Sequence, residues 1–331
     1  MSGFMQLPDL ASARLGGRAV AANDEFFAPK ENLVLDAAPI FDPARYTDRG
    51  KWMDGWETRR RREPGQDWCV VRLGVPCVVR GVVVDTTHFR GNHPRSAFID
   101  ACRLATEPER WEDVEWSPLV PESTLTGDAE NPFAVTDGGS WTHVRLSIVP
   151  DGGVARLRVH GEAAPDWARV SRTEPTGDVE VASIPRGGVV IACSDEFFGA
   201  PNHLLLPDAS EGMWDGWETR RRRDSGHDWV VVRLGHRVRV ERVEVDTRHF
   251  KGNYPGSASV EAIDATDAGP TELFAESAAW REVVPRRPLR PDVAHVLEPP
   301  ELSPADATHV RLSIFPDGGV ARLRVRGTLL D

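Results

Sequence analysis

Three short segments of this sequence carry side chains that could do chemistry. The first is His88-Phe-Arg-Gly-Asn-His-Pro94, which places imidazole, guanidinium and amide groups within seven residues. Histidine titrates near neutral pH, so His88 is a candidate proton donor or acceptor, with Arg90, Asn92 and His93 as candidate ligand-binding residues. The alternative is a loop whose polar side chains bind its own backbone.

The second segment is Asp54-Gly-Trp-Glu-Thr-Arg-Arg-Arg-Arg62. Guanidinium groups bind carboxylates through paired hydrogen bonds, so an anionic ligand fits this string. On a strand, Glu57, Arg59 and Arg61 would share one face, and Trp56 suggests that its own face is partly buried. These three residues are therefore candidate ligand-binding residues. An internal lattice of Glu–Arg ion pairs that holds the sheet is the alternative.

The third segment is the acidic pair Asp24-Glu25, which precedes two phenylalanines. Paired carboxylates could act in catalysis, bind N–H groups or hold a divalent metal ion such as Mn²⁺. They could equally cap the turn before the aromatic pair. No tight spacing of ligands in the sequence demands a metal, so the sequence leaves the cofactor open.

All three segments occur twice, in the same order. Asp24–Phe27 returns as Asp195–Phe198 at an offset of 171 residues, and Asp54–Arg62 returns unchanged as Asp215–Arg223 at an offset of 161. This repetition indicates a tandem duplication. The second copy adds the candidate site residues Asp195, His203, Glu218, Arg220, His249, Lys251, Asn253 and Tyr254.

The offsets also locate the length differences between the copies. The first copy has ten more residues between Lys30 and Trp52, and the second has five more between Pro255 and His309. Such differences belong in surface loops. We predict repeats at residues 9–161 and 180–331, joined by a linker at 162–179 that is rich in polar residues and proline.

Each copy is predicted to be all-β. Short apolar runs at Cys69–Leu73, Cys77–Asp85 and His143–Ile148 are bounded by Gly, Pro and Asp, which is typical of strands. The turn Pro150-Asp-Gly-Gly153 between two such runs predicts a hairpin. Helical periodicity is confined to a turn or two near Glu107–Val114. A β-sandwich for each copy follows.

Composition and charge narrow the class of protein. The formal net charge of −11 argues against nonspecific nucleic-acid binding, which needs clustered positive charge. No apolar run approaches the roughly 20 residues of a membrane helix, and Met1–Leu10 lacks the pattern of a signal peptide. The four cysteines show no CxxC or zinc-type spacing, which favours reduced thiols in the cytoplasm.

In this order, the motifs together resemble those of the allantoicase family. The similar segments include Lys51–Arg60, the His-Phe-x-Gly-Asn-x-Pro loops and Val-Arg-Leu-Ser-Ile-x-Pro-Asp-Gly-Gly, and they extend from about Gly16 to Gly327. The resemblance implies two tandem jelly-roll β-sandwich repeats of the galactose-binding-like class. It also implies hydrolysis of allantoate to ureidoglycolate and urea, in purine and allantoin degradation, by a homo-oligomer (a trimer or a hexamer).

The candidate residues suit that chemistry. An arginine would hold the substrate carboxylate. A general acid must protonate the leaving urea nitrogen, because that nitrogen is a poor leaving group as an anion. His88, His249 or a carboxylate such as Asp24 or Glu25 could serve, and the sequence does not decide between them. A noncatalytic β-sandwich that binds sugars or other small ligands is the alternative function.

The two copies differ inside the candidate loops. Arg90 aligns with Lys251, and His93 aligns with Tyr254. Each copy could keep its own site, or one composite site could draw different residues from each copy. Because the differences fall among the candidate residues, we favour the hypothesis of one dominant site per chain.

Overall fold

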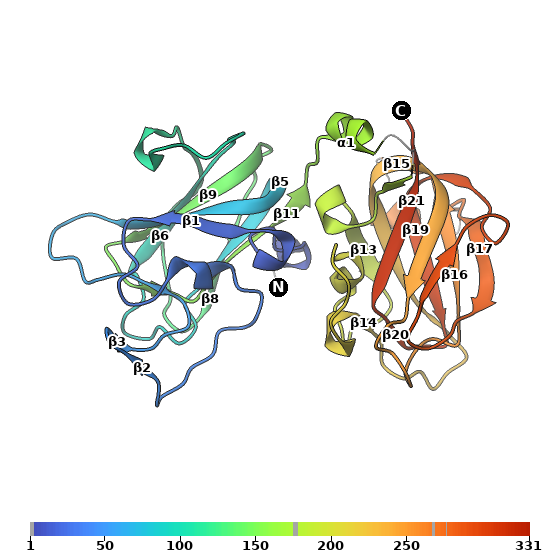
Figure 1. Cartoon of the computed structure of the whole chain (residues 1–331), viewed down its shortest axis with the longest axis horizontal. Coiled ribbons are helices and arrows are strands. Elements are labelled where there is room, and N and C mark those ends of the chain that lie inside the picture. The colour runs from blue at the N-terminus through green and yellow to red at the C-terminus, as the bar shows by residue number, and fades with distance from the viewer. Residues whose placement is uncertain (1–2, 175–177, 267–268, 276) are drawn as a thin grey trace. The chain divides into compact units, whose positions relative to one another are not determined.

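Short runs of buried and half-buried residues form strands through much of the chain, as the sequence predicts (Figure 1). This computed structural model describes residues 3–174, 178–266, 269–275 and 277–331. It divides into two units, Met1–Ala164 and Pro165–Asp331, each with its own sheets. The all-β prediction is confirmed, and each unit contains one copy of the duplicated motifs.

The first unit is built around one large antiparallel sheet. Its strands are β1 (Arg18–Ala22), β5 (Asp67–Asp85), β6 (Ser96–Cys102), β7 (Ser117–Thr124), β8 (Glu130–Ala134), β9 (Ser140–Val149) and β11 (Arg156–Ala163). The order is β1-β5-β9-β6-β7, and β8 and β11 also pair with β5. Two short pairs join β4 (Trp56–Glu57) to β10 (Gly153–Val154) and β2 (Tyr46–Thr47) to β3 (Gly50–Lys51).

The second unit repeats this arrangement. Its strands are β12 (Val179–Glu180), β13 (Val189–Cys193), β15 (Asp228–Asp246), β16 (Ser257–Ile263), β17 (Arg281–Pro288), β18 (Ala294–Leu297), β19 (Ala305–Phe315) and β21 (Arg322–Leu329). The order is β12-β21-β15-β19-β16-β17, and β13 and β18 pair with β15. The short strands β14 (Trp217–Glu218) and β20 (Gly319–Val320) pair as β4 and β10 do.

Helices are few and short. They are α1 (Trp167–Thr173), α2 (Pro270–Leu273), and the 3₁₀ turns η1 (Gly3–Gln6), η2 (Ala13–Leu15), η3 (Lys30–Val34), η4 (Trp111–Asp113), η5 (Ile184–Arg186), η6 (Pro201–Leu205) and η7 (Met213–Asp215). Within the described ranges, no helix is long and apolar enough to cross a membrane. The predicted linker 162–179 contains the end of β11, all of α1 and the first residue of β12, and its residues 175–177 lie outside the described residues.

The long strands β5 and β15 organise the two units. Residues 67–72 of β5 pair with β9, and residues 77–85 pair with β11, although Cys77 and Val78 also pair with β9. The change of partner occurs around Gly74, where a Cβ would lie 2.2 Å from the Leu15 carbonyl oxygen. Gly235 has the same role in β15. Buried valines and leucines of these strands form each core, and the four cysteines are free thiols, as predicted.

The segment Pro150–Gly153 is not a hairpin, and that prediction is wrong. Strands β9 and β11, which flank it, both pair with β5 rather than with each other. The segment instead packs against the His88 loop, where Gly153 N donates to the Asn92 carbonyl oxygen at 2.8 Å. A Cβ on Gly153 would lie 1.9 Å from the Phe89 ring. Glycine therefore permits a close backbone approach here, not a hairpin turn.

The arginine string does not continue as a strand, in contrast to the expected alternation on a sheet. β4 ends at Glu57, so Arg59–Arg62 lie outside the strands that the structure describes. Trp56 is fully buried, as expected, and anchors the start of the string. Its indole N–H donates to the Asp24 carbonyl oxygen at 2.8 Å, which links the acidic pair to the arginine string.

One arginine in each unit is almost completely buried. Arg156 and Arg322 are each 1% exposed. Arg322 Nη2 contacts Asp215 Oδ2 at 2.9 Å, and its Nε donates to the Asp208 carbonyl oxygen at 2.9 Å. Arg156 makes equivalent contacts in the first unit. A buried charge is costly unless it is paired and hydrogen-bonded, so these contacts fix the loops that precede each arginine string.

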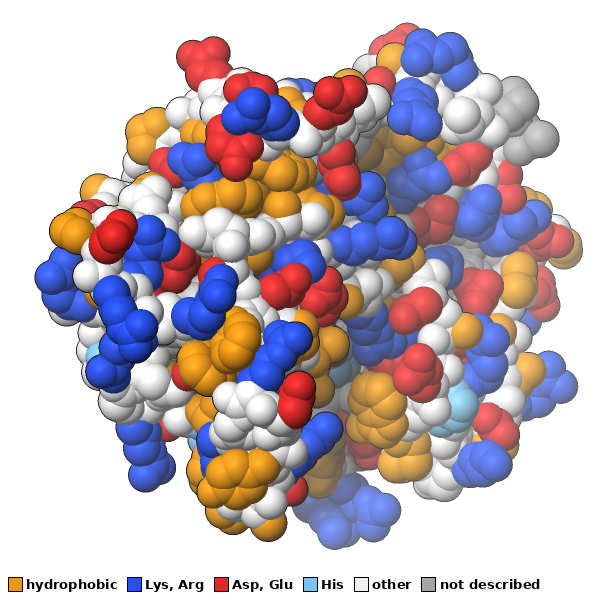
Figure 2. Space-filling model, turned by 60° about the vertical axis from the view of Figure 1, so that its left-hand side comes forward, with side chains coloured by type: hydrophobic (Ala, Val, Ile, Leu, Met, Phe, Trp, Pro, Cys, Tyr) orange, Lys and Arg blue, Asp and Glu red, His pale blue; other side chains and the backbone are white. Residues whose placement is uncertain are grey.

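The face of the molecule in Figure 2 mixes charges of both signs. Lys and Arg side chains are interspersed with Asp and Glu side chains, and hydrophobic side chains are exposed between them. Among the described residues on this face, the cations do not gather into one basic stripe. This distribution agrees with the net charge of −11 and differs from the surface that nucleic-acid binding requires.

Arg322→Met should strongly destabilise the second unit, because it removes the guanidinium that neutralises buried Asp215. Loss of one partner of a buried ion pair costs about 3–5 kcal/mol. Urea-induced unfolding should therefore show a lower midpoint for this unit. The control is Arg237→Met, which breaks a partly exposed pair with Asp264 and should cost at most about 1 kcal/mol. Equal losses for the two variants would contradict the role of Arg322.

Candidate functional site

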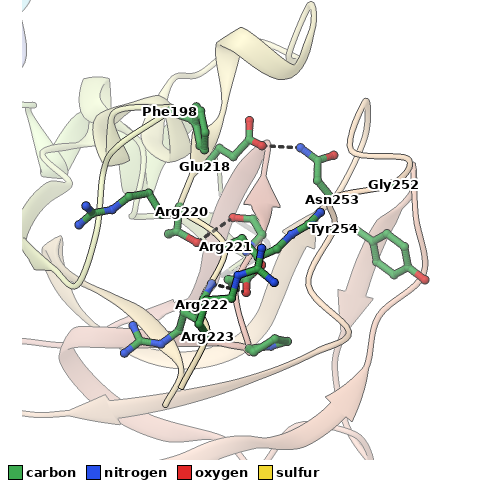
Figure 3. A pocket seen from close by; sticks show the side chains of 13 residues that line it. Phe198, Glu218, Arg220, Arg221, Arg222, Arg223, Gly252, Asn253 and Tyr254 are labelled. Carbon is green, nitrogen blue, oxygen red and sulfur yellow. Dashed lines mark hydrogen bonds between the residues drawn. The ribbon is translucent and has the colours of Figure 1, made fainter. Parts of the chain in front are cut away.

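The four duplicated motifs of the second unit meet at one cavity (Figure 3). Its volume is about 790 Å³. The lining comes from the acidic-aromatic segment, the arginine string, the His249 loop and the Pro-Asp-Gly-Gly segment. The lining residues are Phe198, Glu218, Thr219, Arg220, Arg221, Arg222, Arg223, Gly252, Asn253, Tyr254, Pro316, Asp317 and Gly318. Segments that lie far apart in the sequence thus form one site.

A carboxyl group held by an amide lies in this cavity. Asn253 Nδ2 donates to Glu218 Oε1, as Figure 3 shows. The backbone of Glu218 is held in turn, because its carbonyl accepts from the N–H groups of Phe198 and Gly199 at 3.1 and 3.2 Å. Gly319 N donates to the Asn253 carbonyl oxygen at 2.8 Å, which fixes the amide-bearing loop. The acid and its amide are therefore positioned by three separate segments.

The first repeat contains the same pair. Asn92 Nδ2 donates to Glu57 Oε1 at 2.8 Å. Burial raises the pKa of Glu57, and the hydrogen bond from Asn92 opposes that rise. Burial in the first repeat therefore favours the protonated form of Glu57 more than water does, and the Asn92 amide partly offsets this effect.

Alternate arginines of the string form ion pairs with aspartates. In the second repeat, Arg220 Nε lies 2.8 Å from Asp195 Oδ2, and Arg222 Nη1 lies 2.7 Å from Asp228 Oδ1. In the first repeat, Arg59 and Arg61 pair in the same way with Asp24 and Asp67. An internal lattice of ion pairs therefore exists, but it is built on aspartates and does not include Glu57 or Glu218.

The intervening arginines have no acidic partner. Arg221 and Arg223 of the second repeat are exposed and make no hydrogen bond or ion pair within the described residues, and both line the cavity. Arg60 and Arg62 have the same status in the first repeat. These four cations are free to bind an anion. Sequence reasoning chose Arg59, Arg61 and Arg220 instead, because the spacing alone does not show which arginines the aspartates neutralise.

The two candidate histidines brace their loops. His88 and His249 both adopt a left-handed backbone with φ of 71°. His88 Nε2 lies 3.2 Å from the Pro39 carbonyl oxygen, and His249 Nε2 lies 2.8 Å from the Ser210 carbonyl oxygen. A neutral imidazole in this position donates its Nε2 proton to the carbonyl. That proton is engaged in holding a neighbouring loop.

Two aspartates that lie outside the three candidate segments hold the histidine loops. Asp128 Oδ1 accepts from His88 N at 2.8 Å, and its Oδ2 accepts from Arg90 Nε at 3.0 Å. Asp292 makes the corresponding contacts with His249 N and Lys251 Nζ. Lysine in place of arginine therefore keeps the ion pair but lengthens it from 3.0 to 3.6 Å. No local motif marks these aspartates, which lie about 40 residues after the loops that they hold.

The remaining residues of the histidine loops have separate surroundings. His93 Nδ1 lies 3.0 Å from the Arg90 carbonyl oxygen, so it stays within its own turn. Tyr254 takes the corresponding position in the second repeat and lines the cavity, with its ring turned away from the arginine side chains (Figure 3). The two loops thus present different side chains beside the same Asn–Glu pair.

The acidic pair caps a turn. Asp24 Oδ1 accepts from the backbone N–H groups of Phe26 and Arg59 at 3.1 and 3.0 Å. Burial raises the pKa of Asp24, but these hydrogen bonds and the Arg59 guanidinium outweigh burial and lower it below its ordinary value. Asp195 has the same contacts, and its pKa is lowered by the same balance. Both aspartates are therefore ionised braces of the arginine string. Glu25 is exposed and binds Lys30.

The side chain at position 203 also contacts a backbone carbonyl group. His203 Nδ1 lies 3.2 Å from the Gly216 carbonyl oxygen, and Asn32 Nδ2 donates to the Gly55 carbonyl oxygen at 2.9 Å in the first repeat. The different side chains thus make one equivalent contact. Across the residues that the structure describes, no group of three or more His, Cys, Asp or Glu side chains is arranged to hold a metal ion.

Comparison with known proteins places this geometry in a family. The chain matches the model of the Allantoicase repeat twice, at residues 8–164 and 179–330. The chain belongs to the allantoicase repeat family. Both the resemblance seen in the sequence motifs and the prediction of two β-sandwich repeats are confirmed.

Several members of this family are similar over almost their full length. A protein of Pseudomonas aeruginosa strain UCBPP-PA14 named "probable allantoicase" is 45% identical over 98% of this chain and 97% of its own. A protein of Nocardia farcinica with the same name is 46% identical over 99% of this chain and 96% of its own. The crystal structure of allantoicase from Saccharomyces cerevisiae is 35% identical, covers 97% of this chain and 92% of its own, and has a TM-score of 0.78.

The raised pKa of Glu57 predicts a pH dependence of stability that Glu57→Gln removes. Because the folded pKa lies above the unfolded value, the protonated carboxyl contributes stability below the unfolded pKa of about 4.3. That stability is lost as pH rises through the folded pKa. The stability of Glu57→Gln relative to the natural chain should therefore increase as pH rises from about 4, measured by chemical unfolding of the first unit.

Asn92→Ala provides the matched comparison. It removes the hydrogen bond that opposes the rise in the pKa of Glu57, so the loss of stability with pH should become steeper than in the natural chain. Parallel pH profiles for the natural chain and Glu57→Gln would contradict the assignment.

Proposed function

We propose that this chain hydrolyses allantoate to ureidoglycolate and urea in the cavity of the second repeat. The observation that carries the proposal is the presence, in one cavity, of an amide-bound carboxyl group and two guanidiniums that have no partner among the described residues. The names of the relatives in the allantoicase family support the same reaction. A fold alone would not specify it, because one fold serves many functions.

The charges of the cavity suit the substrate. Allantoate carries one carboxylate and two ureido groups on a single carbon. Arg221 and Arg223 bind the carboxylate, because their guanidiniums have no acidic partner of their own. The Asn253 amide and the Glu218 carboxyl together offer a hydrogen-bond acceptor and a donor to a ureido group.

Hydrolysis breaks one C–N bond of the substrate and forms one C–O bond with water. The leaving nitrogen takes a proton from Glu218, and urea departs as a neutral molecule. Water then adds to the carbon and returns a proton to the carboxylate of Glu218, so that the residue is restored. Asn253 binds Oε1 of Glu218, and Oε2 is left for the reacting nitrogen. His249 is less suited as the acid, since its Nε2 is bound to a carbonyl oxygen.

Glu218→Gln should lower kcat for urea release about 100-fold or more, because it removes the proton donor but keeps the shape of the side chain. Glu57→Gln, the counterpart in the first repeat, should retain most of the activity. Urea release from allantoate by the purified full chain measures both. If Glu57→Gln rather than Glu218→Gln abolished urea release, the reaction would be assigned to the first repeat. No urea release from the natural chain would favour a noncatalytic binding module.

Arg221→Met should raise KM for allantoate at least about tenfold, because a hydrogen bond to a charged group contributes about 1.5–3 kcal/mol. Its effect on kcat should be smaller. Arg242→Met is the control, since Arg242 pairs with Asp178 and Glu298 outside the cavity lining. Equal KM values for the two variants would contradict binding of the carboxylate by Arg221.

A divalent ion such as Mn²⁺ is tested in the same assay. Activity that EDTA removes and Mn²⁺ restores would assign a metal ion to the site. Activity that is unchanged in EDTA would favour catalysis by proton transfer from Glu218 without a metal ion. Assembly as a trimer or hexamer and a cytoplasmic location remain predictions, which size measurement in solution and cell fractionation test.

A further inference from the structure

The first repeat has a cavity of different composition. Its volume is about 460 Å³. It is lined by Asn23, Asp24, Arg59, Arg60, Arg61, Arg62, Glu63 and Asp67. Asn92 instead lines a separate cavity of about 220 Å³ with Phe41 and His88. The free arginines and the amide, which share one cavity in the second repeat, are therefore divided in the first.

The division follows from the longer loop of the first repeat. Phe41 belongs to the stretch in which this copy has ten more residues, and its ring lies 5.7 Å from the His88 ring. The inserted loop thus packs on the amide side of the repeat and leaves the arginine side as a cavity of its own.

The arginine cavity has unbalanced positive charge. Asp24 and Asp67 neutralise the two paired arginines. Arg60 and Arg62 are exposed and have no ion-pair partner within the described ranges, and exposed Glu63 is the remaining carboxylate of the lining. Two guanidiniums in this position suit the carboxylate of a small ligand.

A buried donor and a buried acceptor lie beside these cations. Arg61 Nε and Asp67 Oδ2 are buried and have no hydrogen-bond partner among the described residues, and Asp67 is only 2% exposed. Buried polar groups are normally hydrogen-bonded, so this pair calls for an explanation. An N–H donor next to a carboxylate acceptor is complementary to the C=O and N–H of a ureido group.

The second repeat satisfies the donor of this pair internally, whereas Asp228 Oδ2 is buried without a hydrogen-bond partner among the described residues, as Asp67 Oδ2 is. Asp224 Oδ1 accepts from Arg222 Nε at 3.1 Å and from Gly226 N at 2.8 Å. Glu63 aligns with Asp224, but Arg61 Nε has no hydrogen-bond partner among the described residues. Gly65 lies against the Arg61 guanidinium, since a Cβ built on it would lie 2.7 Å from Nη2, so a ligand reaches Nε only if this turn shifts.

We propose that the first repeat binds a ureido acid, a small carboxylate that carries a ureido group, at a second and noncatalytic site. Arg60 and Arg62 bind the carboxylate, and the Arg61–Asp67 pair binds the ureido group. Glu57, the counterpart of Glu218, is not part of the lining, so the bound molecule lies apart from the carboxyl group that corresponds to the proposed acid. The choice of a ureido acid rests on the proposed function.

Titration calorimetry of the full chain with ureidoacetate tests the proposal. This probe has a carboxylate and one ureido group, but it lacks the second ureido group of allantoate. The natural chain should bind two molecules. The double variant Arg60→Met/Arg62→Met should weaken one binding event at least about tenfold. It should retain the kcat of urea release and the unfolding midpoint, because neither side chain has a partner in the part of the chain that the structure describes. Arg221→Met should weaken the other event.

The outcomes separate this proposal from the proposed function. Two binding events without urea release would overturn the proposed function and support the second site. No binding event, or binding that the Arg60→Met/Arg62→Met variant leaves unchanged, would overturn the second site. So would loss of urea release in the Arg60→Met/Arg62→Met variant, because it would make these arginines part of the reaction. A double variant with lysine at both positions should restore part of the lost affinity.

Discussion

The buried guanidinium of Arg322, with its counterpart Arg156, is the interaction on which the geometry of each repeat depends. It neutralises Asp215 at the start of the arginine string and binds the carbonyl oxygen of Asp208. Ser210, two residues later, receives the ring of His249. One buried guanidinium therefore connects the edge of the sheet, the arginine string and the histidine loop. Because an unpaired buried charge is costly, the ion pair and hydrogen bonds of this guanidinium hold these segments in position.

The charge of the site depends on which arginines of the string are already neutralised by aspartates. Aspartates neutralise every second arginine of the string, so the remaining guanidiniums are available for an external anion. The glycines of the Pro-Asp-Gly-Gly segment let the backbone approach the histidine loop closely, which brings Asn253 to Glu218. The chemistry of the cavity therefore depends on contacts made outside it. In the first repeat Asn92 still binds Glu57, but Asn92 and the free arginines line separate cavities.

Much of the fold could be predicted from the sequence, because apolar runs and glycine or proline boundaries are local signals. The duplication fixed the order of the motifs, and Trp56 correctly marked a buried anchor. The pairing of Pro150–Gly153 was not predictable, since a close approach and a hairpin require the same residue types. The choice between paired and free arginines failed for a related reason. This choice depends on Asp67 and Asp228, which lie beside Arg61 and Arg222 only in the folded chain.

The most direct test of the central claim is the reactivity of individual arginines toward an arginine-specific reagent such as phenylglyoxal, located by mass spectrometry with and without allantoate. Arg221 and Arg223 should react in the free chain and be protected by allantoate, whereas buried Arg322 should be unreactive in both conditions. Unchanged labelling of Arg221 and Arg223 at an allantoate concentration that saturates urea release would contradict the account.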